Sequence, residues 1–189
     1  MLKKLALITL MGMSASAMAG DWQVKFAGSA ITPTGKTDGL KVDHEFAFTP
    51  SVEYFFNDNF STELLLANPI NTEVLKNGDS TGIKLRYLPP TLTFKYNLVN
   101  DSAFTPYVGV GATGFFAWDV KGVDKVKNDV GVAGQIGVNF KPADAKNWGV
   151  FLDVRYADLD PKVRAVAGGD EFKLKIDPVI YTLGYSYKF

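Results

Sequence analysis

The chain has 189 residues, no cysteine and a formal net charge of zero. A disulfide-supported fold is therefore excluded, and no basic excess indicates a nucleic-acid partner. The aromatic content of 13% and the 18 glycines are typical of a β-protein with bends and aromatic girdles.

The N-terminal segment has the pattern of a secretory signal peptide. A basic start at Lys3–Lys4 precedes a mostly apolar stretch over residues 5–13, and Ala17–Ala19 offers a small-x-small cleavage site. We predict a signal peptide over residues 1–19 and one mature domain over residues 20–189; a short N-terminal membrane anchor is the alternative. Without the two lysines, the mature chain has 18 basic and 20 acidic residues, a net charge of −2. No later segment approaches the length of about 18 unbroken apolar residues that a transmembrane helix needs.

Eight later segments alternate between large apolar or aromatic side chains on one face and polar or small side chains on the other. This period of two predicts strands with two different faces. In chain order, the predicted strands are Trp22–Ile31, Glu45–Phe56, Phe60–Ala67, Thr91–Leu98, Phe104–Trp118, Asp129–Phe140, Trp148–Ala157 and Val179–Phe189.

The connections alternate between short polar turns and longer segments rich in Gly, Asp and Lys. This asymmetry is typical of outer-membrane barrels, which have short periplasmic turns and longer extracellular loops. The chain ends on Phe189 after alternating aromatics, and barrel assembly machinery recognises an ending of this kind. A soluble protein would rarely end on a long exposed strand with an apolar face, because such a strand promotes aggregation. We predict an all-β, eight-stranded antiparallel transmembrane β-barrel in the outer membrane of a Gram-negative bacterium. Its expected partners are outer-membrane lipid and the barrel assembly machinery, which would bind the C-terminal strand, and no nucleic acid.

Charged side chains on the inward faces form a candidate network low in the lumen. Glu53 and Glu63 are placed symmetrically about the Asn57–Asn59 turn, so they should face each other across one hairpin and repel. Lys95 lies at a similar height, and Lys25 is a further candidate for compensating their charge. Such a network is either a structural plug of paired charges or a polar constriction in a path for water or ions.

Higher in the barrel, the inward face becomes apolar at Leu65, Ala67, Phe115 and Phe151. An apolar inner wall under the extracellular loops suits a small hydrophobic ligand. The alternative is that these side chains simply pack against each other in a narrow barrel.

Other polar residues give no catalytic, cofactor or metal assignment. His44 is the only histidine, and no nucleophile motif accompanies it. Acidic residues at Asp158, Asp160, Asp170 and Glu171 match no defined cation-binding spacing. We therefore predict that the protein is not an enzyme.

Several stretches, in order along the chain, resemble the OmpW family of small outer-membrane barrels, which includes AlkL-type proteins. They are Glu63–Leu65, Leu88–Leu92 (Leu-Pro-Pro-Thr-Leu), Pro106–Gly111, Ala133–Val138 and Asp177–Pro178.

The resemblance implies passive passage of small hydrophobic molecules. The family's apolar channel opens outward, closes toward the periplasm and is thought to release its cargo sideways into the membrane. Leu65 matches a channel-lining leucine of the family, whereas Arg155 stands where the family often has tryptophan. A non-transporting structural or surface-recognition barrel is the alternative function.

Overall fold

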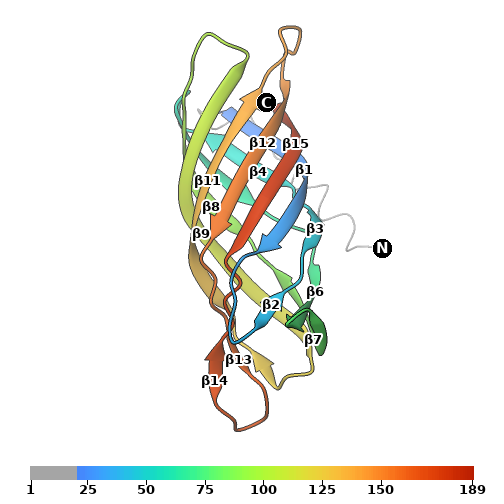
Figure 1. The fold of residues 1–189 in the computed structure, drawn as a ribbon. Coiled ribbons are helices and arrows are strands. Elements are labelled where there is room, and N and C mark those ends of the chain that lie inside the picture. The colour runs from blue at the N-terminus through green and yellow to red at the C-terminus, as the bar shows by residue number, and fades with distance from the viewer. Residues whose placement is uncertain (1–20) are drawn as a thin grey trace, which may run out of the picture.

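The structure, a computed structural model, describes residues 21–189 and shows an all-β fold (Figure 1). The predicted signal peptide at residues 1–19 lies outside the described residues. In the described part of the chain, no helix has the length and apolar character needed to cross a membrane. The strands are β1 (Asp21–Pro33), β2 (Leu40–Val42), β3 (Glu45–Phe48), β4 (Ser51–Phe55), β5 (Phe60–Leu65), β6 (Ile70–Lys76), β7 (Asp79–Leu88), β8 (Thr91–Asn97), β9 (Phe104–Lys121), β10 (Lys125–Val126), β11 (Asp129–Phe140), β12 (Trp148–Ala157), β13 (Lys162–Arg164), β14 (Glu171–Lys173) and β15 (Pro178–Lys188).

Antiparallel pairing closes the main sheet into a barrel. Around the ring, β1 is followed by β3 with β4, then β5, β8, β9, β11, β12 and β15, and β15 pairs again with β1. β3 and β4 together make one barrel strand, which is interrupted at Thr49 and Pro50. Proline has no N–H to donate to a ladder, so it fits this interruption. The eight-stranded antiparallel barrel confirms the predicted fold class.

The outer wall of the barrel is apolar. Side chains alternate between the two faces of every strand, and the outward positions carry mostly large apolar side chains. On β11, for example, Val130, Val132 and Ile136 are exposed while Gln135 is buried. Aromatic rings gather at one end of this surface, where the centroids of Trp22 and Tyr54 lie 4.9 Å apart. A closed sheet with an apolar outer belt satisfies its backbone polar groups internally and can face lipid.

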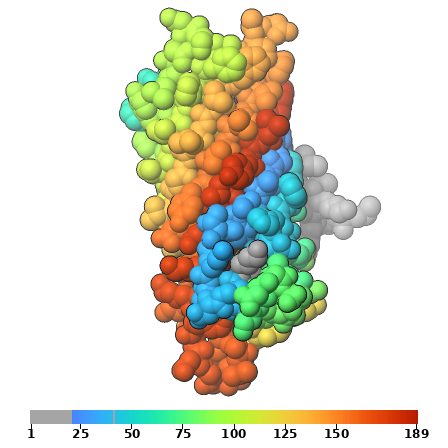
Figure 2. Space-filling view, viewed as in Figure 1, coloured from blue at the N-terminus to red at the C-terminus, as the bar shows by residue number. Residues whose placement is uncertain are grey.

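The two ends of the barrel differ. The short connections at residues 56–59, 98–103 and 141–147 lie at the end that carries the C-terminal Phe189, the upper end in Figure 1. The opposite, long-loop end carries the β6–β7 hairpin and a separate sheet of β10, β13 and β14. Figure 2 shows the segment around β13 and β14 projecting furthest at this end.

The β6–β7 hairpin is a difference from the sequence prediction, which placed no strand between Ala67 and Thr91. β6 pairs with β7, and β7 pairs with the part of β9 that continues beyond the barrel's β8. Asn77 and Gly78 both have positive φ, 53° and 102°, and form the tight turn of this hairpin. An Asn-Gly turn between alternating residues is a strong hairpin signal.

Candidate functional site

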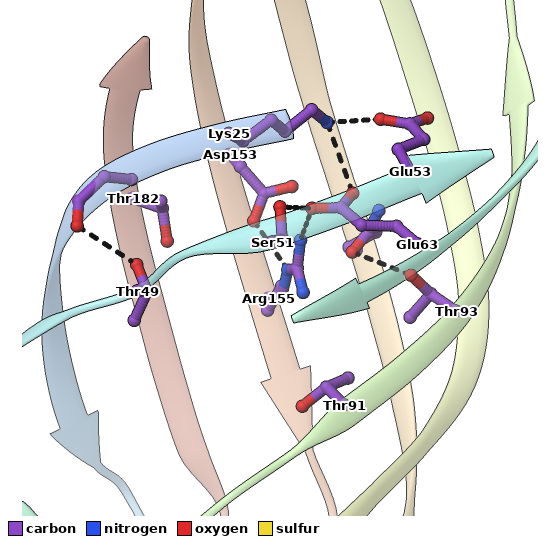
Figure 3. A network of polar contacts seen from close by, with 12 residues as sticks. Lys25, Thr49, Ser51, Glu53, Glu63, Thr91, Thr93, Asp153, Arg155 and Thr182 are labelled. Atoms are coloured by element: carbon purple, nitrogen blue, oxygen red, sulfur yellow. Dashed lines mark hydrogen bonds and ion pairs between the residues drawn. The ribbon is translucent and has the colours of Figure 1, made fainter. Parts of the chain in front are cut away.

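A cluster of buried charged side chains crosses the lumen (Figure 3). Glu53 on β4 and Glu63 on β5 are direct cross-strand partners. The Lys25 Nζ atom lies 2.5 Å from a Glu53 carboxylate oxygen and 3.3 Å from one of Glu63. The Lys95 Nζ atom lies 2.9 Å from a carboxylate oxygen of each glutamate. The structure thus brings together the four charged residues that the sequence placed on the inward face, and all four are completely buried.

Two residues of β12 extend this cluster. Arg155 donates through Nη2 to a Glu63 oxygen at 3.1 Å and through Nε to an Asp153 oxygen at 2.9 Å. The cluster therefore contains three cations and three carboxylates, and we call it the lumen ion cluster: Lys25, Glu53, Glu63, Lys95, Asp153 and Arg155. Equal numbers of opposite charges are expected here, because an unpaired charge in a buried site is very costly.

Neutral groups add hydrogen bonds to the cluster, and of its guanidinium only the buried Nη1 atom of Arg155 has no partner among the described residues. Ser51 donates to Glu63 at 2.7 Å, and Ser61 donates to Glu53 at 2.6 Å. The Tyr107 hydroxyl donates to Asp153 at 3.0 Å, and the Lys95 ammonium lies 3.8 Å from the centroid of the Tyr107 ring. A cluster held by this many bonds fills the cross-section of a narrow barrel with polar groups.

The lumen changes character on the long-loop side of the cluster. Hydroxyl groups come first: Ser29 lies 2.7 Å from Thr49, and Thr91 lies 2.8 Å from Thr113. Beyond them the interior is apolar. Its buried residues, which we call the apolar upper lumen, are Ile31, Val42, Ala47, Ala67, Ile70, Val74, Leu85, Tyr87, Phe115, Ala133, Ala157, Leu159, Ile176 and Ile180.

Two of the five predicted channel-lining residues, Ala67 and Phe115, lie in the apolar upper lumen. Leu65 lies opposite Ser51 and Thr91 on the neighbouring strands, at the level of the hydroxyl groups. Leu65 is 3% exposed and Phe115 is 0% exposed, and the Phe115 ring stacks on Tyr87 with centroids 4.9 Å apart. In this structure these side chains pack against their neighbours.

The other two predicted channel-lining residues lie elsewhere. Phe151 stands near the short-turn start of β12, with its ring centroid 4.9 Å from the Lys25 ammonium, and so does not share the upper wall with Phe115. Arg155 belongs to the lumen ion cluster. Alternation assigned both residues to the inward face, but their height depends on the stagger of strands around the whole ring.

Asp153 and Tyr107 were not among the residues predicted from the sequence. Asp153 lies two residues before Arg155 and so shares its face of the strand, and this spacing was the available signal for an ion pair. Tyr107 is inward at the start of β9 and 1% exposed. Its part in the cluster depends on which strands face each other across the lumen, and alternation along one strand cannot show that.

The barrel wall has a local discontinuity between β3 and β6. On its other edge, β3 pairs with β1 from Gly28↔Phe48 to Ile31↔Glu45. Toward β6, the described residues form no ladder. The edges are joined at one end by Asn68, whose N–H donates to the Phe48 carbonyl at 3.0 Å and whose side-chain oxygen accepts from the Phe48 N–H at 2.7 Å. At the other end the Asp43 N–H donates to Glu73 at 3.1 Å. Ala47, beside this discontinuity, is a member of the apolar upper lumen.

Two hollows stand out on the described chain. One, of about 430 Å³, lies at the short-turn end and is lined in part by Gln23, Asn97 and Asn139. The other, of about 460 Å³, lies on the outer wall over Gly28 and Ala30, where small side chains leave room between β3 and β15. Neither hollow is lined by Leu65 or Phe115.

Carboxylates also gather at the long-loop rim. Asp158, Asp160 and Asp177 each place one oxygen within 4.8 Å of the others. Burial and the two neighbouring carboxylates raise the pKa of Asp177. Glu171, which the sequence analysis grouped with Asp158 and Asp160, instead pairs with Lys127 and Arg164.

Taken together, the closed eight-stranded sheet, the apolar outer belt and the buried ion cluster inside the lumen define an outer-membrane β-barrel protein. The model of the OmpW family matches residues 12–189, which is nearly the whole chain. The chain belongs to this family, as the resemblance of its motifs predicted.

Individual relatives agree with this assignment. The chain is 30% identical to the uncharacterized outer-membrane protein y4mB of Sinorhizobium fredii, with 89% of this chain and 80% of that protein covered. It is 27% identical to outer membrane protein W of Vibrio cholerae, covering 90% of this chain and 89% of that protein. AlkL of Ectopseudomonas oleovorans is 25% identical, covering 93% and 85% of the two chains. The dibenzothiophene metabolism operon protein PahQ of Pseudomonas aeruginosa is 24% identical, covering 94% and 86%.

A solved structure gives the same fold. The crystal structure of OprG from Pseudomonas aeruginosa superposes with a TM-score of 0.76 at 26% identity, covering 90% of this chain and 96% of that one. The protein is therefore located in the outer membrane, with its short turns in the periplasm and its longer loops outside the cell.

Proposed function

We propose that this barrel gives passive passage to small hydrophobic molecules, which enter from the extracellular end and leave sideways into the membrane. The observation that carries the proposal is the division of the lumen into an apolar upper part and a lumen ion cluster beneath it. An apolar molecule is stabilised by about 25 cal/mol for each Å² of its surface that leaves water for apolar surroundings. It would gain nothing from displacing the paired charges below, so a straight route to the periplasm is unfavourable.

The discontinuity between β3 and β6 supports a sideways exit. Separating two strands of a ladder breaks a row of backbone hydrogen bonds in a setting without water to replace them. Between β3 and β6 this cost is already absent over residues 45–47, and Ala47 there belongs to the apolar upper lumen. The name of the relative PahQ refers to dibenzothiophene metabolism, and we infer aromatic and other apolar compounds of similar size as cargo.

Passage requires movement within the upper lumen, because Phe115 and Tyr87 are buried there and packed against each other. The same packing favours the second candidate function, a structural or surface-recognition barrel without transport. The two functions differ in whether the upper lumen ever opens.

A disulfide across the discontinuity tests the proposed exit. The natural chain has no cysteine, so the double variant Phe48→Cys/Asn68→Cys would contain only the intended pair. The backbone hydrogen bond between these residues, 3.0 Å long, places them at a separation typical of disulfide-bonded positions. We expect uptake of a hydrophobic fluorescent probe into liposomes containing the barrel to fall on oxidation and to recover on reduction.

The matched control is Val138→Cys/Leu152→Cys, a directly opposed pair on the outer face of the intact β11–β12 ladder. Oxidation of the control should leave uptake unchanged. Equal uptake by the oxidised and reduced exit variant would rule out release between β3 and β6. Uptake no faster than in protein-free liposomes would rule out transport and favour the recognition barrel.

A further inference from the structure

The three-stranded sheet at the extracellular end has two faces of opposite character. On one face Val126 and Val163 are buried and Phe172 packs against the same apolar core. Because side chains alternate along a strand, the residues on either side of each of these three point to the opposite face. These residues, which we call the basic face, are Lys125, Lys127, Lys162, Arg164, Glu171 and Lys173.

The basic face concentrates positive charge on a small area. It carries five cations and a single carboxylate, whereas the mature chain as a whole has more acidic than basic residues. Glu171 lies 2.8 Å from the Lys127 ammonium and 2.7 Å from Arg164, and these hydrogen bonds lower its pKa. Glu171 therefore remains charged and fixes two of the cations in place.

The remaining cations are only partly compensated. At the edges of the face, Asp160 lies 3.3 Å from Lys173 and Asp124 lies 3.7 Å from Arg164. Lys125 and Lys162 are exposed and form no ion pair with any residue of the chain from 21 to 189. Even with the flanking carboxylates included, the cations remain in excess.

The basic face stands over the lipid-facing wall of the barrel. On β12, Tyr156 points outward at the edge of the apolar belt, and Lys162 points outward six residues later. Six extended residues span at most about 20 Å. Between them Leu159 is buried, so the outward direction is kept along this segment. Figure 2 shows the segment extending past the end of the barrel. In an outer membrane this is the layer of lipopolysaccharide sugars, whose inner units carry phosphate and carboxylate groups.

We propose that the basic face binds the phosphorylated inner sugars of the lipopolysaccharide that surrounds the barrel. Lysine and arginine side chains close to an anionic membrane surface are attracted to it, and they form charge-assisted hydrogen bonds with phosphate oxygens. The apolar contacts of Val126, Val163 and Phe172 hold the sheet so that the cations are presented together. This interaction does not depend on the proposed transport function.

Binding can be measured with the barrel in phosphatidylcholine nanodiscs and an acyl-free, phosphorylated lipopolysaccharide core oligosaccharide as the probe. We expect saturable binding that weakens as salt is added, because exposed charges are screened. The variant Lys125→Glu/Lys162→Glu should lose at least roughly tenfold in affinity. The control Lys36→Glu/Lys76→Glu carries the same charge change at exposed positions elsewhere on the extracellular end and should bind like the natural protein. The same oligosaccharide after removal of its phosphates should bind weakly to all three.

Each other outcome overturns the proposal. Equal binding by the natural protein and by Lys125→Glu/Lys162→Glu would exclude this face as the binding site. An equal loss of affinity in the control variant would show that only the overall charge matters. Undiminished binding of the dephosphorylated oligosaccharide would exclude phosphate recognition. Binding of heparin without binding of the core oligosaccharide would assign the face to an external sulfated polysaccharide instead. A difference in gel mobility between unheated and boiled samples identifies folded barrels. If Lys125→Glu/Lys162→Glu does not fold, Lys125→Gln/Lys162→Gln takes its place.

Discussion

Glu53 and Glu63 lie directly opposite each other on β4 and β5, and both carboxylates are completely buried. Two like charges in that position repel, and removing each from water adds a further cost. Their coexistence depends on the ammonium groups of Lys25 and Lys95, each of which contacts both carboxylates.

The substitution Lys95→Ala should therefore destabilise the barrel, because it leaves the lumen ion cluster with one uncompensated negative charge. Breaking a buried ion pair from one side typically costs about 3–5 kcal/mol. We expect a lower urea midpoint in lipid or detergent, partly restored by adding Glu63→Gln. The comparison is Lys188→Ala, which removes an exposed 2.7 Å ion pair with Asp21 and should cost less than about 1 kcal/mol. A midpoint for Lys95→Ala as high as that of Lys188→Ala would contradict the role assigned to Lys95.

Arg155→Trp tests how the cluster and the channel are related. From the resemblance alone, introducing the family's frequent tryptophan should speed uptake of hydrophobic probes. The structure adds a cost, because Asp153 would keep only the Tyr107 hydroxyl and Glu63 would lose one cation. We expect Arg155→Trp to lower the unfolding midpoint by an amount similar to Lys95→Ala, and Arg155→Trp/Asp153→Asn to recover part of it by restoring neutrality. No recovery in the double variant would show that the loss comes from the size of the indole rather than from charge.

Phe115→Ala tests whether the packed upper lumen restricts passage. Removing a fully buried phenylalanine typically costs about 3–5 kcal/mol and leaves a cavity. If transport occurs through the apolar upper lumen, the cavity should raise the rate of hydrophobic-probe uptake by folded protein. Phe94→Ala is the control, since Phe94 faces lipid on the outer wall. Unaltered uptake by folded Phe115→Ala would favour the structural or recognition function.

Deletion of Phe189 tests the C-terminal strand as an assembly signal. The Phe189 N–H donates to the Trp22 carbonyl at 2.8 Å, and its ring packs against Tyr187 at the periplasmic rim. We expect the truncated protein to insert poorly into the outer membrane and to accumulate or be degraded in the periplasm. Surface labelling of intact cells measures this, with Lys188→Ala as a neighbouring change that keeps the terminal aromatic. Normal surface levels of the truncated protein would show that assembly does not require Phe189.

The barrel strands could be predicted from sequence wherever one face meets lipid. The predicted bounds of β11 and β12 match the structure, because both strands alternate apolar and polar residues along their whole length. β13 and β14 also alternate, with Val163 and Phe172 between charged residues, but each strand has only three residues. So short an alternation does not distinguish a strand from a loop, which is why neither strand was predicted.

The inward direction of the candidate site residues could be predicted throughout, but their height only for Glu53, Glu63 and Lys95, which lie close to short turns. Parity placed Glu53, Glu63, Lys95 and Lys25 on the inward face, and hairpin symmetry paired the two glutamates. It also placed Phe151 and Arg155 inward. Which residues share a level is set by the stagger of all eight barrel strands, a property of the closed ring that no single segment contains.

The lumen ion cluster draws its members from five different barrel strands: β1, β4, β5, β8 and β12. A slip of β5 by one residue against its neighbours would turn Glu63 from the lumen to the lipid, and Lys95 would lose its ion pair with Glu63. Backbone ladders alone tolerate such a slip, since every register offers similar hydrogen bonds. The buried charges thus discriminate between registers, so that a barrel closed with a strand displaced carries an electrostatic penalty before it ever reaches its working state.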